Sequence, residues 1–407
     1  MKCRLCDADV ERTFLDLGMQ PLSNAYVRPH EAEQPEMFYP LHVRVCERCL
    51  LVQLPELAAP SQIFKDYAYL SSTSSSWVAH AGRFVGDVTP RFGLNGTSRV
   101  IEVASNDGYL LRHFQERGIP VLGIEPAANV ADIARAKGVP TLTAFFTAEL
   151  AQKVVLEGGA FDLVVANNVL AHVPDLNGFV RGLGRLLAPG GVLSVECPHL
   201  LRLLEGTQFD TIYHEHFSYF SLGVLLRLFT SHGLEVFDVE PLSTHGGSLR
   251  VFAQKANGPR PVSRSVASCL AEEERDGGLS LARYDRFAED VVQVKRRLLG
   301  FLIEEKAQGH RIAAYGAPAK GNTLLNFAGV RRDFIDFVVD RNTLKQGTLL
   351  PGTRIPVFAP ERIREERPDV VLLLPWNLET ELAPELRFVR EWGGRVVIPV
   401  PDVRVLS

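Results

Sequence analysis

Residues 210–220, DTIYHEHFSYF, concentrate side chains that can do chemistry. His214 and His216 flank Glu215, and Tyr213 precedes them. Residues of these types can bind a metal ion, transfer a proton or pack against one another. Neighbouring residues of a helix or strand point to different faces, so only a loop would let these three converge on one ion. From the residues alone, a packed aromatic–histidine cluster and an active site are both open interpretations.

Two Cys-x-x-Cys pairs form a second chemical feature. Each pair can supply two thiolates from one tight turn, and two such turns complete a tetrahedral four-sulfur Zn²⁺ site. A redox pair and incidental thiols are the alternatives, and the doubled spacing argues against both. A site closed by four sulfurs has no open position, so we expect the zinc to support folding rather than catalysis. The predicted ligands are Cys3, Cys6, Cys46 and Cys49, with Cys197 and Cys269 as free thiols.

A small-residue turn in VIEVASNDGYLL is the third feature. The pattern predicts a strand, a turn and a helix, and the N–H groups of such a turn can face a closely approaching ligand. VLGIEP then places Glu125 at the tip of a second strand, where a carboxylate can bind both ribose hydroxyls of an adenosine. FDLVVANNVLAHVPD brings Asn167 and Asn168 to the end of a third strand.

The turn lacks the G-x-G-x-x-G pattern of a dinucleotide site, because Ala104 stands where the first glycine is expected. A turn of this kind, followed by an acidic strand tip, fits S-adenosylmethionine better than NAD. The alternative is that Glu125 only caps a helix.

Short apolar runs that alternate with amphipathic segments begin at about Ser98. SRVIEVA, VLGIE, FDLVVA and GGVLSVE predict buried parallel strands. LEVFDVEPLSTHGGSLRVFAQK predicts two more strands, joined by a turn that contains Gly246 and Gly247. Together these segments predict a doubly wound α/β domain that ends in a β-hairpin.

A linker, ANGPRPVS, follows this domain, and a long helix is predicted near Leu279–Lys306. RIAAYG, FIDFVVD, DVVLLLP and RVVIPV then predict the strands of a second, smaller α/β domain. The apolar stripe of the long helix consists of Tyr284, Phe287, Val291, Val294, Leu298 and Phe301.

AAYGAPAKGNTLLNF in this second domain resembles a P-loop, but Lys320 precedes Gly321, whereas the lysine of a P-loop follows its second glycine. A strand, a tight turn and a helix N-terminus with one lysine remain, and these can seat a pyrophosphate. The alternative is a plain turn of a Rossmann-like fold that binds no ligand.

The composition excludes several classes of protein. A net charge of −4 provides no basic surface for nucleic acid or an anionic membrane. The chain has 46% hydrophobic and 23% charged residues, as soluble globular proteins do, and no apolar run approaches the ~20 residues of a membrane span. Its six cysteines are too few and too uneven for a secreted disulfide scaffold. We therefore expect a cytoplasmic protein without nucleic-acid or membrane partners.

Over nearly its whole length the chain resembles the NDP-sugar C-methyltransferases of deoxysugar biosynthesis. The order of four zinc-type cysteines, then ASNDG, GIEP and NNVLAHVPD, then YGAPAKGNTLLNF carries the resemblance. It implies an α/β protein with a small N-terminal zinc-binding domain (1–66) and a central Rossmann-like methyltransferase domain (67–257). A C-terminal Rossmann-like domain (258–407) would help to bind a nucleotide-sugar.

The resemblance also implies roles for individual residues. The expected catalytic residues in the sugar pocket are His216, Glu215, Tyr213, His172 and Tyr67. The expected methyl-donor site comprises Glu102, Ala104, Asn106, Asp107, Gly108, Glu125, Pro126, Phe145, Asn167 and Asn168, with Ala144–Phe146 lining the adenine. Further substrate contacts are expected from His245, Lys320, Asn322 and Asn326.

These observations predict a zinc-containing enzyme that transfers a methyl group from S-adenosylmethionine to carbon 3 of a dTDP-linked 4-keto-deoxysugar. His216 would remove the carbon-bound proton, Glu215 would orient it, and tyrosine or histidine groups would hold the enolate oxygen. A relative that methylates carbon 5 would carry the same motifs. The alternatives are an O- or N-methyltransferase that uses His216 as its base, and a non-catalytic nucleotide-binding module.

Overall fold

The computed structural model describes residues 1–57, 70–275 and 279–406. They form two compact units, and each unit is built from three separate stretches of chain. Unit 1 comprises Met1–Val10, Cys46–His199 and Phe217–Leu279, and unit 2 comprises Glu11–Val45, Leu200–His216 and Ser280–Ser407.

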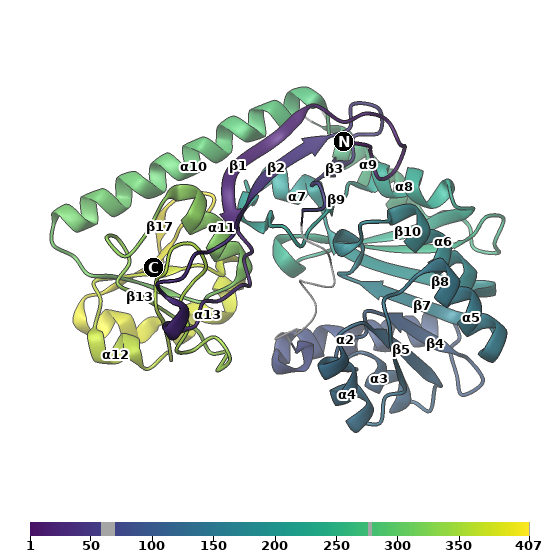
Figure 1. Cartoon of the computed structure of the whole chain (residues 1–407). Helices are drawn as coiled ribbons and strands as arrows, with labels where there is room; N and C mark the ends of the chain where they lie inside the picture. Colours follow the sequence, from purple (N-terminus) through teal and green to yellow (C-terminus); the bar gives the residue numbers. More distant parts are fainter. Residues whose placement is uncertain (58–69, 276–278, 407) are drawn as a thin grey trace. The chain divides into compact units, whose positions relative to one another are not determined.

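A seven-stranded sheet forms the centre of unit 1 (Figure 1), in the order β10-β11-β8-β7-β4-β5-β6. The strands from β8 to β6 pair in parallel, and β11 pairs antiparallel with both β8 and β10. This confirms the predicted doubly wound sheet with a terminal hairpin. The strands are β4 (Val100–Val103), β5 (Val121–Glu125), β6 (Thr141–Thr143), β7 (Phe161–Asn167), β8 (Leu187–Pro198), β10 (Leu234–Leu242) and β11 (Ser248–Lys255).

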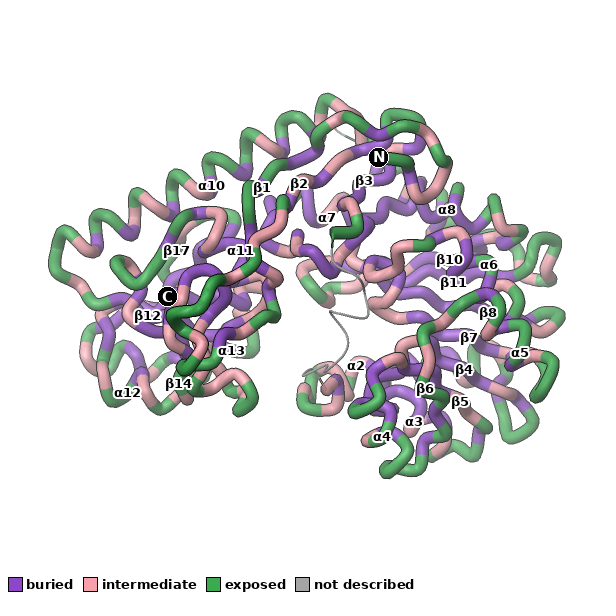
Figure 2. Tube along the Cα trace, viewed as in Figure 1, coloured by how far each residue is buried: buried purple, intermediate pink, exposed green. Residues whose placement is uncertain are grey.

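Alternation along the strands gives this sheet two buried faces. Val164 on β7 contributes to one hydrophobic core, whereas its neighbours Leu163 and Val165 contribute to another. Figure 2 shows these strands as largely buried. The helices and short 3₁₀ turns of unit 1 are η2 (Ser71–Thr73), α2 (Ser75–Arg91), α3 (Leu111–Gln115), α4 (Ala128–Ala136), α5 (Ala148–Gly158), η3 (Leu170–His172), α6 (Leu176–Leu186), α8 (Leu222–Thr230), η5 (Thr244–Gly246) and α9 (Arg264–Glu274).

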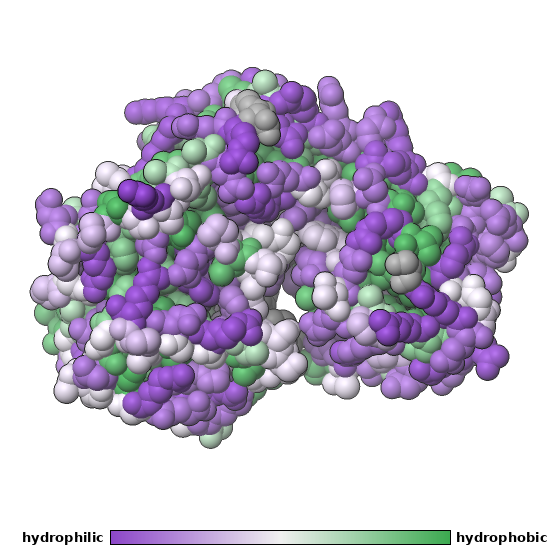
Figure 3. All heavy atoms as spheres, turned by 180° about the vertical axis from the view of Figure 1, so that it is seen from behind, coloured by the Kyte–Doolittle hydropathy of each residue, from purple (hydrophilic) through white to green (hydrophobic). Residues whose placement is uncertain are grey.

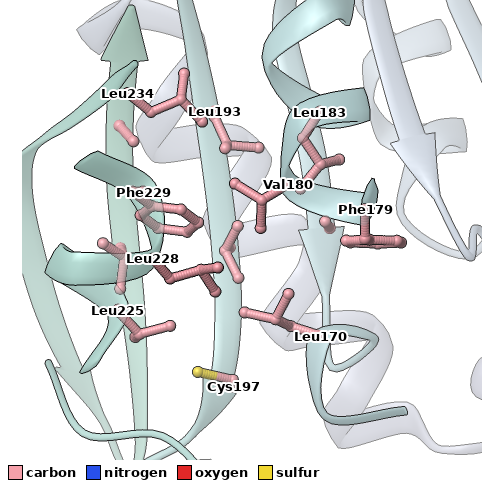
Figure 4. Close-up of a cluster of buried hydrophobic side chains, with 14 of the residues drawn as sticks. Leu170, Phe179, Val180, Leu183, Leu193, Cys197, Leu225, Leu228, Phe229 and Leu234 are labelled. Carbon is pink, nitrogen blue, oxygen red and sulfur yellow. The ribbon is translucent and has the colours of Figure 1, made fainter. Parts of the chain in front are cut away.

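The larger core lies where α6 and α8 cover β8 (Figure 4). Val180 and Leu183 on α6 point toward Leu193 on β8, and Leu228 and Phe229 on α8 approach from the other side of the view. All five side chains are fully buried. Because α6 and α8 share this core, they fix each other as well as the strand beneath them.

A hairpin and a six-stranded sheet make up most of unit 2. β1 (Thr13–Pro21) pairs antiparallel with β2 (Phe38–Val45). The sheet has the order β14-β13-β12-β15-β16-β17 and is parallel except for β17, so the predicted second α/β domain is present. Its strands are β12 (Ile312–Tyr315), β13 (Phe337–Val339), β14 (Val357–Phe358), β15 (Val370–Leu373), β16 (Arg395–Ile398) and β17 (Arg404–Val405).

The long helix α10 (Leu281–Ala307) confirms the predicted helix of unit 2 and packs on β1. Phe14 on β1 contacts Tyr284 and Phe287, with ring centroids 5.3 Å away in both pairs. The predicted stripe is correct up to Leu298, but Leu302 is buried where Phe301 was expected. The remaining helical segments are η1 (Pro29–Glu31), α7 (Leu200–Glu205), η4 (Phe209–Thr211), α11 (Ala319–Ala328), α12 (Arg362–Glu366), η7 (Trp376–Leu378), α13 (Glu379–Glu385) and η8 (Arg387–Trp392).

Hydrophilic residues cover most of the face seen in Figure 3, and hydrophobic residues appear between them in smaller patches. Within the described ranges, no helix has both the length and the apolar character needed to cross a lipid bilayer.

Leu228→Ala tests the core between α8 and β8. The side chain is fully buried, so its loss should lower the free energy of unfolding by about 2–5 kcal/mol. Leu156→Ala on α5 is the matched control, because Leu156 is 78% exposed and the change should cost about 0.5 kcal/mol or less. Urea unfolding followed by circular dichroism measures both. Equal midpoints for the two variants would contradict this assignment of the core.

Candidate functional site

The two Cys-x-x-Cys pairs of unit 1 fold into turns of the same geometry. The N–H of Asp7 donates to the carbonyl of Cys3 at 3.0 Å, and the N–H of Leu50 donates to that of Cys46 at 2.8 Å. Asp7 and Leu50, each directly after the second cysteine of its pair, have φ of 58° and 62°. Each turn therefore aims both of its thiols in one direction.

The four sulfurs have the spacing of a tetrahedral zinc site. Sγ of Cys3 lies 3.5 Å from Sγ of Cys49, and Sγ of Cys6 lies 3.6 Å from Sγ of Cys46. Zn–S bonds of about 2.3 Å in a tetrahedron separate the sulfurs by about 3.8 Å. All four ligand atoms lie within 4.8 Å of one another, so the cysteines fit Zn²⁺.

Gln53 links this cluster to the strand that follows it. Its Nε2 donates to Sγ of Cys3 at 3.3 Å, and its Oε1 accepts from the N–H of Arg4 at 3.1 Å. The hydrogen bond from Cys49 is the main cause that lowers the pKa of the Cys3 thiol, and Gln53 adds to it. Gln53 belongs to β3 (Val52–Gln53), which pairs with β9 (Ser218–Tyr219).

The turn after β4 takes left-handed backbone conformations without the glycines of a dinucleotide motif. Ala104, Asn106 and Gly108 have φ of 59°, 49° and 77°. A Cβ on Gly108 would lie 2.8 Å from Cγ2 of Val139, so both φ and space require glycine there. Ala104 tolerates this conformation only at a cost in free energy, and such strain is concentrated at ligand sites.

Glu125 at the tip of β5 binds this turn through its carboxylate. The carboxylate accepts from the N–H of Asn106 at 3.0 Å and from the N–H of Ala127 at 2.9 Å. Ala127 is the N-cap of α4, so this hydrogen bond also fixes the backbone where the helix begins. A carboxylate has about four acceptor positions, and two remain for ribose hydroxyls. Burial raises the pKa of Glu125, and the two N–H donors oppose that effect.

Asp107 and Asn106 are held from two sides. Lys137 donates to the Asp107 carboxylate at 2.7 Å, and the Ser72 hydroxyl and N–H donate to it as well. Oδ1 of Asn106 accepts from the N–H of Ser71 at 2.8 Å. The turn is therefore fixed in shape by side chains as well as by its own backbone.

Several buried polar atoms near the carboxyl ends of β4 and β7 have no hydrogen-bond partner among the described residues. They are Oε2 of Glu102, Oδ1 of Asn167, and both amide atoms of Asn168. Burial and the nearby charges of Glu125 and Asp107 raise the pKa of Glu102 well above its usual range. Buried polar groups are normally paired, so these atoms fit a polar ligand such as the methionine part of S-adenosylmethionine.

The predicted adenine segment follows β6. The N–H of Ala144 donates to the carbonyl of Glu125 at 3.2 Å, which ties the segment to the expected ribose contact. Phe145 is 48% exposed, whereas Phe146 packs edge-on against Phe179 with centroids 5.2 Å apart. Phe145 is thus the phenylalanine with a face available to a ring. Pro126 stays a predicted contact.

Two predicted substrate residues also lie in unit 1. His172 ends η3 and is half-buried. His245 lies in η5 with φ of 56° and packs against Trp77 at 5.1 Å. Tyr67, the fifth predicted catalytic residue, lies outside the described residues.

The His-Glu-His stretch belongs to unit 2 up to His216, and its side chains diverge. His216 Nδ1 lies 2.8 Å from the carbonyl oxygen of Thr211, and the centre of its ring lies 4.1 Å from that of Tyr213.

The side chains of Glu215 and His214 have other partners. The Glu215 carboxylate accepts from the Asn24 amide at 2.6 Å, and Nε2 of His214 lies 3.3 Å from the carbonyl oxygen of Pro40. Burial raises the pKa of Glu215 and lowers that of His214.

Glu215 was expected to orient His216. Nδ1 of His216 contacts the Thr211 carbonyl and Glu215 accepts from Asn24, so the orienting role of Glu215 stays a prediction. The three side chains do not form a metal site: within the described ranges, the groups with metal-ligand spacing are the four cysteines and the set His199, Cys269 and Glu273.

Lys320 lies in the first turn of α11, at the carboxyl edge of the sheet of unit 2. Its Nζ donates to Oδ1 of Asn377 at 2.8 Å and lies 4.8 Å from the centre of the Trp376 ring. Burial lowers the pKa of Lys320 and raises that of the neighbouring Asp210 to about 6.

The side-chain amides of Asn322 and Asn326 donate to backbone carbonyls within unit 2. Asn322 donates to the carbonyl of Ser23, and Asn326 donates to the carbonyls of Asn322 and Pro351. Of the three predicted contacts, Lys320 alone carries a charge for a phosphate.

Models of three protein families match successive parts of the chain: a zinc binding domain at 3–64, a methyltransferase domain at 77–239 and a C-methyltransferase C-terminal domain at 243–401. C-methyltransferase NovU of Streptomyces niveus is 39% identical over 406 residues, which are 100% of this chain and 97% of NovU. The chain belongs to this C-methyltransferase family. The C-methyltransferase uses S-adenosylmethionine and has a structural Zn²⁺ site, so the predicted C-methyltransferase class, cofactor and metal are confirmed.

More distant similarities are confined to part of the C-methyltransferase. The ubiquinone biosynthesis O-methyltransferase of Chelativorans sp. (strain BNC1) is 27% identical over 118 residues, which are 29% of this chain and 45% of that protein. The crystal structure of the PH0226 protein from Pyrococcus horikoshii OT3 matches with a TM-score of 0.38 and 16% identity, covering 46% of this chain and 95% of that one. At that score the structural match supports no further argument.

Cys46→Ser tests the zinc site. The wild type should hold one Zn²⁺ per chain, and the variant should lose it together with solubility and thermal stability, because metal binding here contributes folding free energy. Metal analysis by mass spectrometry gives the stoichiometry. Cys269→Ser should keep the full zinc content. Wild type purified without zinc would contradict the assignment.

Glu125→Ala tests the donor site. The change should weaken binding of S-adenosylhomocysteine by about 1.5–3 kcal/mol for each charge-assisted hydrogen bond that is lost to ribose. Glu125→Gln, which keeps one acceptor oxygen, should lose less. Isothermal titration calorimetry measures both affinities. Wild-type affinity in the alanine variant would mean that Glu125 is only the cap of α4.

Proposed function

We propose that the enzyme methylates a ring carbon next to the ketone of a dTDP-linked 4-keto-deoxysugar, and that this carbon is C3. Methyl transfer to carbon requires a carbanion equivalent, which a 4-keto sugar provides as an enolate once a base removes the neighbouring proton. S-adenosylmethionine supplies the electrophilic methyl group when bound. The transfer would form the carbon–carbon bond as the methyl–sulfur bond of the donor breaks, leaving S-adenosylhomocysteine; the ketone is restored and the base keeps the proton.

The hydrogen bond between His216 and Thr211 carries this proposal. A peptide carbonyl can only accept, so Nδ1 of His216 must carry the proton of the neutral ring. Nε2 is then the basic nitrogen, and a histidine fixed in one tautomer suits a general base at neutral pH. Tyr213, whose ring lies 4.1 Å from that of His216, could donate to the enolate oxygen.

A backbone hydrogen bond within unit 1 bears on the role proposed for His172. Phe217 follows His216 directly, and its N–H donates to the carbonyl of Ala171 at 2.7 Å. Ala171 precedes His172 in η3. We propose His172, with Tyr213, as a contact to the enolate oxygen or to a sugar hydroxyl, and Glu215 and Tyr67 as further members of the pocket.

Lys320 supports the nucleotide part of the proposal. It lies beside the turn after β12, at the carboxyl edge where open α/β sheets bind ligands. Its ammonium group, which donates a hydrogen bond to Asn377, can neutralise part of a pyrophosphate. We propose Lys320 as the pyrophosphate contact, and His245, Asn322 and Asn326 as outer contacts to the nucleotide-sugar.

His216→Asn separates proton removal from methyl transfer. In D₂O with S-adenosylhomocysteine and dTDP-4-keto-6-deoxyglucose, the wild type should exchange the proton at the future methylation carbon. An asparagine amide can still donate to the Thr211 carbonyl but cannot accept a proton at neutral pH. Both exchange and methylation should therefore fall by about 10²–10⁴, as expected for loss of a positioned general base. Proton NMR follows the exchange.

Tyr213→Phe and His172→Asn should slow both steps less than His216→Asn does, and binding of the donor should be unchanged in all three variants. Wild-type exchange in His216→Asn would place the base elsewhere. NMR of the methylated product locates the new bond, and a methyl group on C5, oxygen or nitrogen would contradict the proposed C3 target.

A further inference from the structure

Unit 1 contains a buried charged network that the proposed chemistry does not use. Glu196 on β8 lies opposite Arg250 on β11, and its carboxylate accepts from Nη2 of Arg250 at 2.9 Å. His80 on α2 brings its Nε2 to 3.0 and 3.2 Å from the two carboxylate oxygens, and the Thr244 hydroxyl donates at 3.1 Å. Glu196 itself is fully buried.

Glu196 is ionised within this network. A buried carboxylate needs a compensating charge, which Arg250 provides while it also contacts Glu240 at 3.2 Å and stacks on Phe84. Burial alone would raise the pKa of Glu196, but the hydrogen bond from His80 and the charge of Arg250 lower it below its usual range. The carboxylate is therefore ionised.

The same contacts determine which nitrogen of His80 carries its proton. Nε2 faces two carboxylate oxygens, which accept, and one guanidinium nitrogen, Nη2 of Arg250 at 3.1 Å, which donates. An unprotonated Nε2 would set its lone pair against both oxygens, so the proton belongs on Nε2. In the neutral ring Nδ1 is then an acceptor, and no hydrogen bond from the described residues engages it. The side chain is 13% exposed.

The network lies at the edge of the sheet where a ligand of unit 1 is expected. Glu196 is in register with Asn167, whose Oδ1 is buried without a partner among the described residues. Trp77 stacks on His80 at 4.9 Å and on Tyr109 at 6.3 Å. Tyr109 directly follows Gly108, the last residue of the turn after β4 described above. The donor contacts predicted at β4 and β5 lie across β7 from β8. Glu196, which His80 contacts, is therefore on the side of β7 away from the ribose end of the donor.

We propose that His80 contacts the methyl-accepting substrate: its Nδ1 accepts a hydrogen bond from a substrate hydroxyl, and Glu196 with Arg250 holds the ring in that orientation. His80 is a specificity-determining residue of the transferase, and Glu196 and Arg250 are positioning residues. The hydroxyl assignment rests on the proposed sugar substrate, whereas the tautomer does not.

The first test uses His80→Gln. The glutamine amide can replace Nε2 in its bond to Glu196 but offers nothing at the place of Nδ1, so a purely structural role of His80 would survive. With dTDP-4-keto-6-deoxyglucose, KM for the sugar should rise about tenfold, with little change in KM for the methyl donor.

The 2-deoxy and 3-deoxy analogues of this sugar identify the hydroxyl. With wild type, one of the two analogues should have a KM about tenfold higher than the parent sugar. With His80→Gln, the same analogue should have the KM of the parent sugar. His113→Gln on α3 is the control, because His113 has a similar side-chain exposure of 15% and lies outside the network.

The second test needs no substrate. In ¹⁵N NMR of the histidine rings, His80 should show the neutral tautomer with its proton on Nε2, and Glu196→Gln should shift it toward the other tautomer. A wild-type His80 with its proton on Nδ1, or His80→Gln with wild-type KM for every analogue, would overturn the proposal. If wild type fails to methylate this sugar, the proposed substrate is wrong, and the same KM comparison with the sugar that wild type does methylate then decides the inference.

Discussion

Four cysteine sulfurs that lie within 4.8 Å of one another constrain a long path of backbone in this enzyme. The second Cys-x-x-Cys turn continues into β3, where Gln53 donates to Sγ of Cys3. β3 pairs with β9, and the N–H of Leu54 donates to the carbonyl of Phe217 at 2.9 Å. Phe217 in turn donates to Ala171, the neighbour of His172. A metal site that performs no chemistry thus fixes the backbone on which two proposed catalytic histidines depend.

A backbone carbonyl and a buried carboxylate determine the tautomers of two histidines, because each accepts a hydrogen bond from one nitrogen of the ring. The Thr211 carbonyl assigns the proton of His216 to Nδ1, and Glu196 assigns that of His80 to Nε2. The two rings are therefore prepared with opposite tautomers. Substitution of Glu196 can change the assignment at His80, whereas the Thr211 acceptor is a backbone carbonyl that no side-chain substitution removes.

The sequence predicted features that depend on local spacing or on long apolar runs. The zinc ligands, the parallel strands and the long helix were all correct for this reason. The three-residue strand β6 and helix α9 were missed, because β6 is too short for a pattern and α9 follows a linker rich in proline and glycine. Leu302 replaces Phe301 because the two are adjacent and only the exact turn of α10 decides which side chain faces inward.

Contacts between distant parts of the chain were beyond such reasoning. The local sequence does not predict the contact between His216 and the carbonyl of Thr211, five residues earlier, because the adjacent Glu215 is the more obvious partner. The network of His80, Glu196 and Arg250 depends on the register between β8 and β11 and on the placement of α2. One signal was present: Glu196 and Arg250 are charges within apolar strand segments, and a charge in such a position needs a buried partner.

The interleaving of the two units has a consequence for synthesis on the ribosome. The last stretch of unit 1 ends at Leu279, so all of its chain has been translated before the third stretch of unit 2 begins. Until α10 appears, Phe14 on the β1–β2 hairpin lacks the aromatic rings of Tyr284 and Phe287 that cover it in the finished enzyme. Some 230 further residues are translated between the end of β2 and the start of α10, and Phe14 lacks these two aromatic partners throughout. The nascent chain is therefore most exposed to aggregation, and most in need of a chaperone, between the completion of β2 and the arrival of α10.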